Sequence, residues 1–207
     1  LAAARRVAVV GGGISAAQLA TALAAGGTQV TVVSRHSVRV ERFDSDPAWL
    51  GPKAMRGFQA TSDLDARRRD IADARHRGSM PPEVAADLRR EVRAGKITWV
   101  EAEVTDATAA AGAVSLALDR EPGAVVADRV VLATGFDAHR PGGAMVDDAV
   151  AELGLPCARC GYPIVSPQLE WAPGLFVTGP LAELELGPTA RNIAGARAAG
   201  ERLRRVA

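Results

Sequence analysis

Cysteine is nearly absent from this sequence, since only Cys157 and Cys160 occur among 207 residues. Two thiols are too few for a disulfide framework, and too few by themselves for a metal site of four thiolates. Charge of one sign is not in excess either, because 25 Lys and Arg residues stand against 24 Asp and Glu residues. We therefore expect no global field that recruits nucleic acid or an anionic membrane, and any charged ligand must be bound locally.

Long hydrophobic runs are also missing. No apolar stretch approaches the roughly 20 residues that cross a bilayer, and the Ala-rich, Arg-containing start lacks the apolar core of a secretory signal. We expect a cytoplasmic protein whose partner is a small-molecule substrate. Because residue 1 is Leu and a strand follows almost at once, we also expect a chain that begins inside something larger.

The start of the chain has the pattern of a βαβ unit. A β-branched run at residues 6–10 predicts a strand, small residues at 14–25 predict a helix, and QVTVVS at 29–34 predicts a second strand. Two strands joined through a helix in about 30 residues favour a parallel sheet covered by helices. The expected fold class is α/β, a Rossmann-like three-layer nucleotide-binding fold.

The rest of the chain predicts further helices, a β-meander and a closing strand and helix. In chain order we expect a loop with a short helix at 46–58, helices at 64–77 and 83–93, strands at 97–105, 114–119 and 128–133, a helix at 144–153, a strand at 174–178 and a helix at 188–204. A boundary near 107–112 would separate a nucleotide-binding domain, residues 1–110, from a C-terminal portion, residues 111–207.

The turn after the first strand carries a dinucleotide-binding fingerprint. Gly11, Gly13 and Ala16 match G-x-G-x-x-G/A, with a strand before and a helix after. The first glycine permits the tight turn, the second lets the backbone approach a pyrophosphate, and Ala16 lets the helix pack closely. Ile14 and Ser15 open the helix, where free N–H groups favour phosphate. The alternative is a close helix–strand crossing that merely needs small residues.

The end of the second strand bears on which dinucleotide is bound. A carboxylate there would accept hydrogen bonds from the ribose hydroxyls of NAD or FAD. This chain has Ser34, Arg35 and His36 instead. A hydroxyl and a guanidinium suit a 2′-phosphate, so Ser34 and Arg35 favour NADPH over NADH, although NADH stays possible. The alternative is that Arg35 is a solvated loop residue.

A second motif, DRVVLATGFDAHRP at 128–141, predicts a buried strand that ends in small residues where backbone could approach a ligand. It resembles a motif of flavoprotein oxidoreductases with two dinucleotide-binding domains, the pyridine nucleotide-disulfide oxidoreductase superfamily, and most of all their flavin-dependent N-hydroxylating monooxygenases. The residues in register are Asp128, Leu132, Ala133, Thr134, Gly135, Phe136 and Pro141, with Phe where Tyr is usual. The resemblance implies cofactor contacts at Ala133, Thr134 and Gly135.

The C-terminal stretch at 174–203 is similar to the last strand and helix of the same flavoproteins. The resemblance implies FAD contacts at Gly179, where the strand ends, and at Gly187 and Thr189, near the helix start. Free N–H groups near 189–192 would stabilise negative charge on a reduced flavin. Many relatives have Asp after the glycine, and this chain has Pro180. The alternative is a strand and helix that merely close an α/β sheet.

The resemblance covers only the later part of the family pattern, because a first, FAD-binding fingerprint has no counterpart here. It implies an FAD- and NADPH-dependent oxidoreductase, monooxygenase-like or reductase, of which this chain holds the NADPH-binding portion and the C-terminal part of the FAD-binding domain. The missing N-terminal FAD-binding segment would be its partner. The alternative is a non-catalytic NADP(H)-binding module or remnant.

Three smaller patterns favour ordinary explanations. Cys157 and Cys160 have the spacing of a dithiol reductase, but they lie between prolines and not at a helix start that would activate a thiol. The arginine cluster at 67–77 contains interleaved aspartates, which favours a solvated helix face over a phosphate site. The three histidines are too scattered to predict a metal site.

Overall fold

The structure is a computed structural model that describes residues 4–137 and 139–205. The chain forms two compact units, each built from two stretches of sequence. The first unit comprises Leu1–Asp44 and His76–Phe136, and the second comprises Ser45–Arg75 and Asp137–Ala207. This division differs from the expected boundary near residue 110, since the strands that follow it stay in the first unit and residues 45–75 lie in the second.

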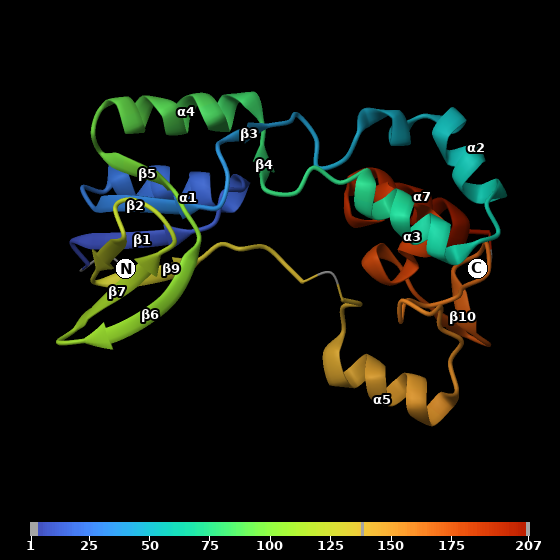
Figure 1. The fold of residues 1–207 in the computed structure, drawn as a ribbon. Coiled ribbons are helices and arrows are strands. Elements are labelled where there is room, and N and C mark those ends of the chain that lie inside the picture. The colour runs from blue at the N-terminus through green and yellow to red at the C-terminus, as the bar shows by residue number, and fades with distance from the viewer. Residues whose placement is uncertain (1–3, 138, 206–207) are drawn as a thin grey trace. The chain divides into compact units, whose positions relative to one another are not determined.

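A four-stranded parallel sheet forms the centre of the first unit (Figure 1). Its strands, in spatial order, are β5 (Ile97–Glu101), β2 (Gln29–Ser34), β1 (Arg6–Val10) and β9 (Arg129–Leu132). The chain moves outward from β1 through β2 to β5 and then returns to the other side of β1. Strand order therefore reverses at β1, and this reversal is where open α/β sheets bind their ligands.

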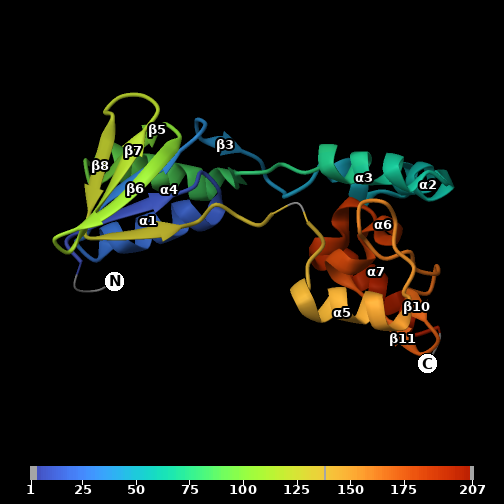
Figure 2. The ribbon, with the colours of Figure 1, turned by 60° about the horizontal axis from the view of Figure 1, so that its bottom comes forward.

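Other elements cover both faces of the sheet. They pack on apolar side chains that β1 directs to each side. Val7 and Val9 pack on one side with helices α1 (Ile14–Ala25) and α4 (Pro82–Arg93). Ala8 packs on the other side with a meander, whose strands lie side by side in Figure 2. The meander strands are β6 (Val104–Ala110), β7 (Ala113–Leu118) and β8 (Ala124–Ala127). The three-layer α/β class with an added meander is confirmed.

Two strand predictions in this unit need correction. The strand expected at 97–105 is divided at Ala102. This residue is buried, and its N–H donates to the Ser34 carbonyl at 2.9 Å. After this bond the chain leaves the parallel sheet. The strand expected to be buried, β9, lies at the edge of the sheet, and Leu132 is 73% exposed. A short pair, β3 (Arg39–Val40) and β4 (Ser79–Met80), completes the unit.

The second unit is mostly helical. Its α-helices are α2 (Pro52–Ala60), α3 (Leu64–Asp73), α5 (Gly143–Leu153), α6 (Glu183–Leu186) and α7 (Ile193–Leu203). Its 3₁₀ turns are Pro47–Leu50, Gly179–Ala182 and Pro188–Arg191. The helix expected at 188–204 is thus interrupted at Asn192. The strand expected at 174–178 is only β11 (Leu175–Phe176), which pairs with β10 (Glu170–Ala172) in an antiparallel hairpin and does not join a parallel sheet.

Buried ion pairs join distant parts of the second unit. Glu183 is 1% exposed and accepts from Arg68 and, at 2.7 Å, from Arg191. Glu185 likewise accepts from Arg67 at 3.1 Å and from Arg202 at 2.7 Å. The expectation of a solvated face is therefore wrong for Arg67 and Arg68, whose charges are neutralised by carboxylates more than a hundred residues away in sequence.

Among the described residues, no helix combines the length and the apolar character needed to span a membrane.

Candidate functional site at the glycine turn

The glycine turn lies at the carboxyl end of β1, where strand order reverses. Gly11 has a φ of +139°, and its N–H donates to the Val33 carbonyl at 2.9 Å. A Cβ at Gly11 would lie 2.2 Å from the Ala133 carbonyl oxygen. Only glycine fits this position, and its use brings the turn directly against the end of β9.

The two glycines that follow differ in what surrounds them. A Cβ at Gly12 would meet the Ser34 Oγ at 2.2 Å, so protein packing explains this glycine. A Cβ at Gly13 would meet nothing closer than the Gly78 Cα at 3.5 Å, which is an ordinary contact. Internal packing therefore does not require glycine at Gly13, whereas the close approach of a pyrophosphate to the backbone would.

The start of α1 adds a positive end of a helix dipole to this turn. Gly13 is the N-cap residue and no side chain caps it, and the first turn holds no acidic residue. Ile14 and Ser15 are exposed, while Ala16 is buried at 0% exposure and lets the helix pack on the sheet. Uncapped N–H groups beside a partly buried glycine turn favour an anion.

The end of β2 places Ser34 and Arg35 differently. Ser34 is 2% exposed, and its hydroxyl donates to the His36 carbonyl at 2.8 Å, so it closes the local turn. Arg35 is exposed, and its only ion pair within the described chain joins its Nη1 to the Glu103 Oε1 at 4.0 Å. A contact this long between solvated groups is weak, and the guanidinium is free to bind an incoming phosphate.

His36 is the site residue that sequence reasoning did not assign. Its ring packs between two glycines, since a Cβ at Gly12 would lie 2.8 Å from Cε1 and a Cβ at Gly78 would lie 2.6 Å from Nε2. Its Nδ1 lies 2.8 Å from the Ser37 carbonyl oxygen, so the bond requires the proton on Nδ1. The signal available in the sequence was its position in the loop after β2.

The residues after β9 complete the edge of the first unit. The Ala133 N–H donates to the Val10 carbonyl at 2.7 Å, which fixes the end of β9 beside β1. Thr134 and Gly135 follow and are exposed, with Gly135 at a φ of +82°. The structure thus brings the glycine turn, the end of β2 and residues 133–135 to one edge of this unit.

The candidate FAD residues lie in the second unit and lack a comparable cradle. A Cβ at Gly179 would meet nothing within 4 Å, and one at Gly187 would meet the flexible Met55 side chain at 3.1 Å. Both glycines have positive φ and serve turns, whereas Thr189 is 6% exposed. Their positive φ accounts for glycine at both positions, so we derive no FAD contact from them.

Two of the N–H groups expected to be free near 189–192 are used within the protein. The Ala190 N–H donates to the Gly187 carbonyl and the Asn192 N–H donates to the Thr189 carbonyl, both at 3.0 Å. The Asn192 side chain accepts from the N–H groups of Ala194 and Gly195. Asn192 thus caps α7, and the expectation of free donors is wrong for Ala190 and Asn192.

Cys157 and Cys160 lie in a tight turn of the second unit. Gly161 donates to the Ala158 carbonyl at 2.8 Å, and both thiols are free and partly buried. Burial raises the pKa of Cys157, although the nearby Arg140 charge acts in the opposite direction. A thiol whose pKa is raised is a poor nucleophile, and this environment does not favour a dithiol reductase.

The first unit thus has a fold of the Rossmann type. Residues 6–50 match the family model described as pyridine nucleotide-disulphide oxidoreductase. No curated protein matches the chain. Over residues 6–50 the chain is therefore similar to that family, which agrees with the predicted resemblance.

Solved structures share the fold at low sequence identity. The ornithine N-hydroxylase KtzI of Kutzneria sp. 744, solved with FADred, NADP+ and L-orn, is 22% identical with a TM-score of 0.73, covering 99% of this chain and 55% of that chain. The ornithine hydroxylase PvdA of Pseudomonas aeruginosa is 18% identical with a TM-score of 0.70, and the match covers 100% of this chain and 54% of that chain. The flavoprotein disulfide reductase RclA of Escherichia coli is 17% identical with a TM-score of 0.57, and the match covers 98% of this chain and 35% of that chain. The chain spans about half the length of the two hydroxylases.

Proposed function

We propose that the first unit binds NADPH at the glycine turn, and that the chain is the NADPH-binding portion of an FAD- and NADPH-dependent oxidoreductase, monooxygenase-like or reductase. The observation that carries the proposal is Gly13, where no contact within the protein demands glycine and the helix start is uncapped. NADPH supplies a hydride when bound, and the residues of this chain hold and orient it.

The choice of NADPH over NADH depends on Arg35. Its weakly paired guanidinium lies at the end of β2, and the Ser34 hydroxyl is already used inside its own turn. Arg35 is therefore the group proposed to bind the 2′-phosphate, with a charge-assisted hydrogen bond that NAD cannot receive. His36 lies next to it against the glycine turn and is positioned to take part.

Calorimetric titration of Arg35→Gln tests this proposal. We expect the affinity for NADP+ to fall roughly tenfold while the affinity for NAD+ stays unchanged, because only NADP+ carries the charge that Arg35 contacts. Arg129→Gln is the matched control, since Arg129 is an exposed arginine at the opposite end of the parallel sheet. Equal losses for both nucleotides, or the same loss in the control, would contradict the proposal.

FAD enters the proposal through the resemblance and the superfamily, and not through a contact in the second unit. Since the positive φ of Gly179 and Gly187 accounts for both glycines without a ligand, the second candidate is a non-catalytic NADP(H)-binding module. The two candidates separate in an assay of NADPH oxidation with added FAD and ferricyanide as acceptor. Turnover above the rate of free FAD supports an oxidoreductase, and NADP+ binding without turnover supports the module.

A further inference from the structure

The Arg35 guanidinium has a carboxylate from another part of the sheet beside it. Arg35 follows β2, whereas Glu103 lies just beyond the end of the neighbouring strand β5. The Arg35 Nη1 and the Glu103 Oε1 are 4.0 Å apart, and the two side chains are 76% and 59% exposed. Within the part of the chain that the structure describes, Arg35 pairs with no other carboxylate. An anion that binds Arg35 therefore also approaches Glu103.

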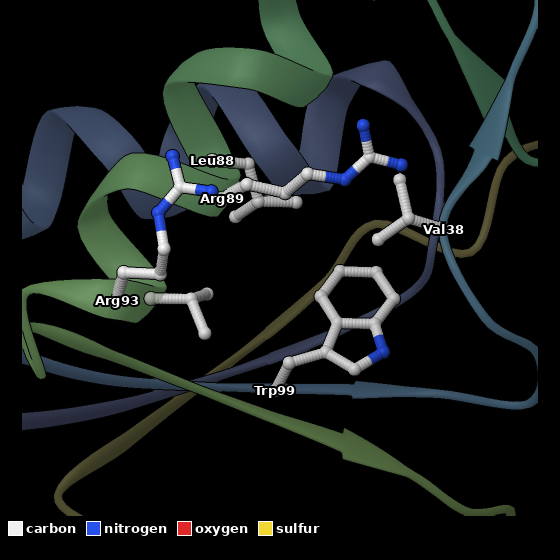
Figure 3. Close-up of a pocket in the computed structure, with 6 residues that line it drawn as sticks. Val38, Leu88, Arg89, Arg93 and Trp99 are labelled. Atoms are coloured by element: carbon white, nitrogen blue, oxygen red, sulfur yellow. The ribbon is translucent and has the colours of Figure 1, made fainter.

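The backbone segments that carry these two residues are held in place. The Glu103 N–H donates to the Asp119 Oδ1 at 2.8 Å, and the Glu103 carbonyl accepts from the Asp119 N–H at 3.1 Å. Val38, on the segment that follows Arg35, and Trp99, on β5, pack against the same helix-side core. In Figure 3 the Trp99 ring faces α4, with Val38 to one side. The two solvated side chains thus extend from fixed segments.

A 2′-phosphate bound to Arg35 brings its charge close to this carboxylate. The phosphate holds nearly two negative charges at pH 7, since the second pKa of a phosphate monoester is about 6. Given the 4.0 Å contact, a phosphate oxygen that accepts a hydrogen bond from the Arg35 guanidinium lies within roughly 9 Å of the Glu103 Oε1. That separation is shorter than the screening length of about 10 Å at 0.1 M salt. NAD carries no phosphate at this position and meets no such repulsion.

We propose that Glu103 is a specificity-determining residue, which opposes the binding of NADP(H) at Arg35 and leaves the binding of NAD(H) unaffected. Two effects act in the same direction. The phosphate has to replace Glu103 as the counter-ion of Arg35, and it then remains near a carboxylate that has lost its partner. The inference rests on the proposed NADPH site. It means that the preference of this site for NADP(H) over NAD(H) is smaller than Arg35 alone would give.

Calorimetric titration of Glu103→Gln with NADP+ and with NAD+ tests the proposal. At about 0.1 M salt we expect the variant to bind NADP+ about threefold more tightly than the unsubstituted chain does, which is the size expected for one exposed charge pair. The affinity for NAD+ should not change. Glu83→Gln is the matched control, because Glu83 is an exposed carboxylate on α4 of the same unit, and it should leave both affinities unchanged. Melting temperatures check that both variants fold.

Salt and a second substitution show whether the effect is electrostatic and acts at Arg35. At about 1 M salt the gain in NADP+ affinity should disappear, because the screening length falls to about 3 Å. In the Arg35→Gln background, Glu103→Gln should give no gain, since the phosphate is then not held beside the carboxylate.

The possible failures of the two proposals are distinguishable. If the unsubstituted chain binds NADP+, three results overturn the role of Glu103 and leave the proposed function standing. They are an unchanged NADP+ affinity in Glu103→Gln, an equal gain for NAD+, and a gain that persists at high salt or in the Arg35→Gln background. If neither the unsubstituted chain nor Glu103→Gln binds NADP+, the proposed function fails and the role of Glu103 fails with it.

Discussion

At the scale of single residues, Gly11 combines two constraints that a side chain would violate. Its φ of +139° is strained for any other residue, and a Cβ would lie 2.2 Å from a backbone oxygen that cannot move aside cheaply. We predict that Gly11→Ala lowers the free energy of unfolding of the first unit by about 2 kcal/mol or more. Hydrogen exchange at the β1 amides measures this effect locally.

Gly27→Ala is the matched control for that substitution. Gly27 also has a positive φ, at +83°, but open space surrounds the position of its Cβ. The control should therefore cost only about 1 kcal/mol, the conformational penalty alone. Equal losses in the two variants would show that the contact with Ala133 does not constrain the turn.

Asp128 ties the beginning of β9 to the beginning of β1. Its carboxylate accepts from the backbone N–H groups of Arg5 at 3.0 Å and Arg6 at 2.9 Å, and it pairs with the Arg6 guanidinium. The Arg6 side chain, followed by these backbone donors, lowers the pKa of Asp128 below its usual range. Because the folded pKa is lowered, the stabilisation is present above the unfolded pKa of about 3.9 and is lost as the pH falls below it.

Asp128→Asn tests that linkage. We predict that the variant is less stable than the unsubstituted chain at pH 7, and that the difference shrinks as the pH falls below about 4. Urea unfolding at a series of pH values, again read at the β1 amides, gives the two curves. A difference in stability that does not depend on pH would mean that the charge of Asp128 contributes nothing.

At the scale of elements, the second unit depends on carboxylates buried against arginines. Glu183 is 1% exposed and faces both Arg68 on α3 and Arg191, which follows α6. We predict that Glu183→Gln lowers the free energy of unfolding of this unit by about 3 kcal/mol, because two largely buried guanidiniums lose their counter-charge. Urea unfolding followed by the fluorescence of Trp171, a buried residue of this unit, measures the loss.

The neighbouring Arg69 provides the control for that prediction. Arg69 is 67% exposed and its partner Asp63 is 60% exposed, so Arg69→Gln should cost less than about 0.5 kcal/mol. A cost for Glu183→Gln as small as that of the control would contradict a structural role for the buried pairs.

Elements defined by local sequence were predictable, and those defined by distant partners were not. The bounds predicted for β1, α1 and β2 agree with the structure because β-branched alternation and the glycine fingerprint act within one short segment. The division between β5 and β6 depends on a bond from Ala102 to Ser34, which no local pattern reveals. The same holds for Arg67 and Arg68, whose carboxylate partners lie in the C-terminal part of the chain.

At the scale of the whole molecule, the candidate site residues fall into two groups. Gly11, Gly13 and residues 133–135 lie with the end of β2 in the first unit, whereas Gly179, Gly187 and Thr189 lie in the second. The position of the first group was predictable, because the fold class alone places a glycine turn at the reversal of strand order. The unit boundaries were not, because residues 45–75 join the second unit through contacts that are distant in sequence.

The central claim, that the glycine turn binds NADP(H), is tested most directly by following the backbone amide resonances of the chain during titration with NADP+. At 21.5 kDa the chain suits this measurement. The account predicts saturable shifts at residues 11–16, at Arg35 and His36, and at residues 133–135, with smaller shifts elsewhere in the first unit. Shifts that avoid these residues, or an unchanged spectrum at saturating NADP+, would contradict it.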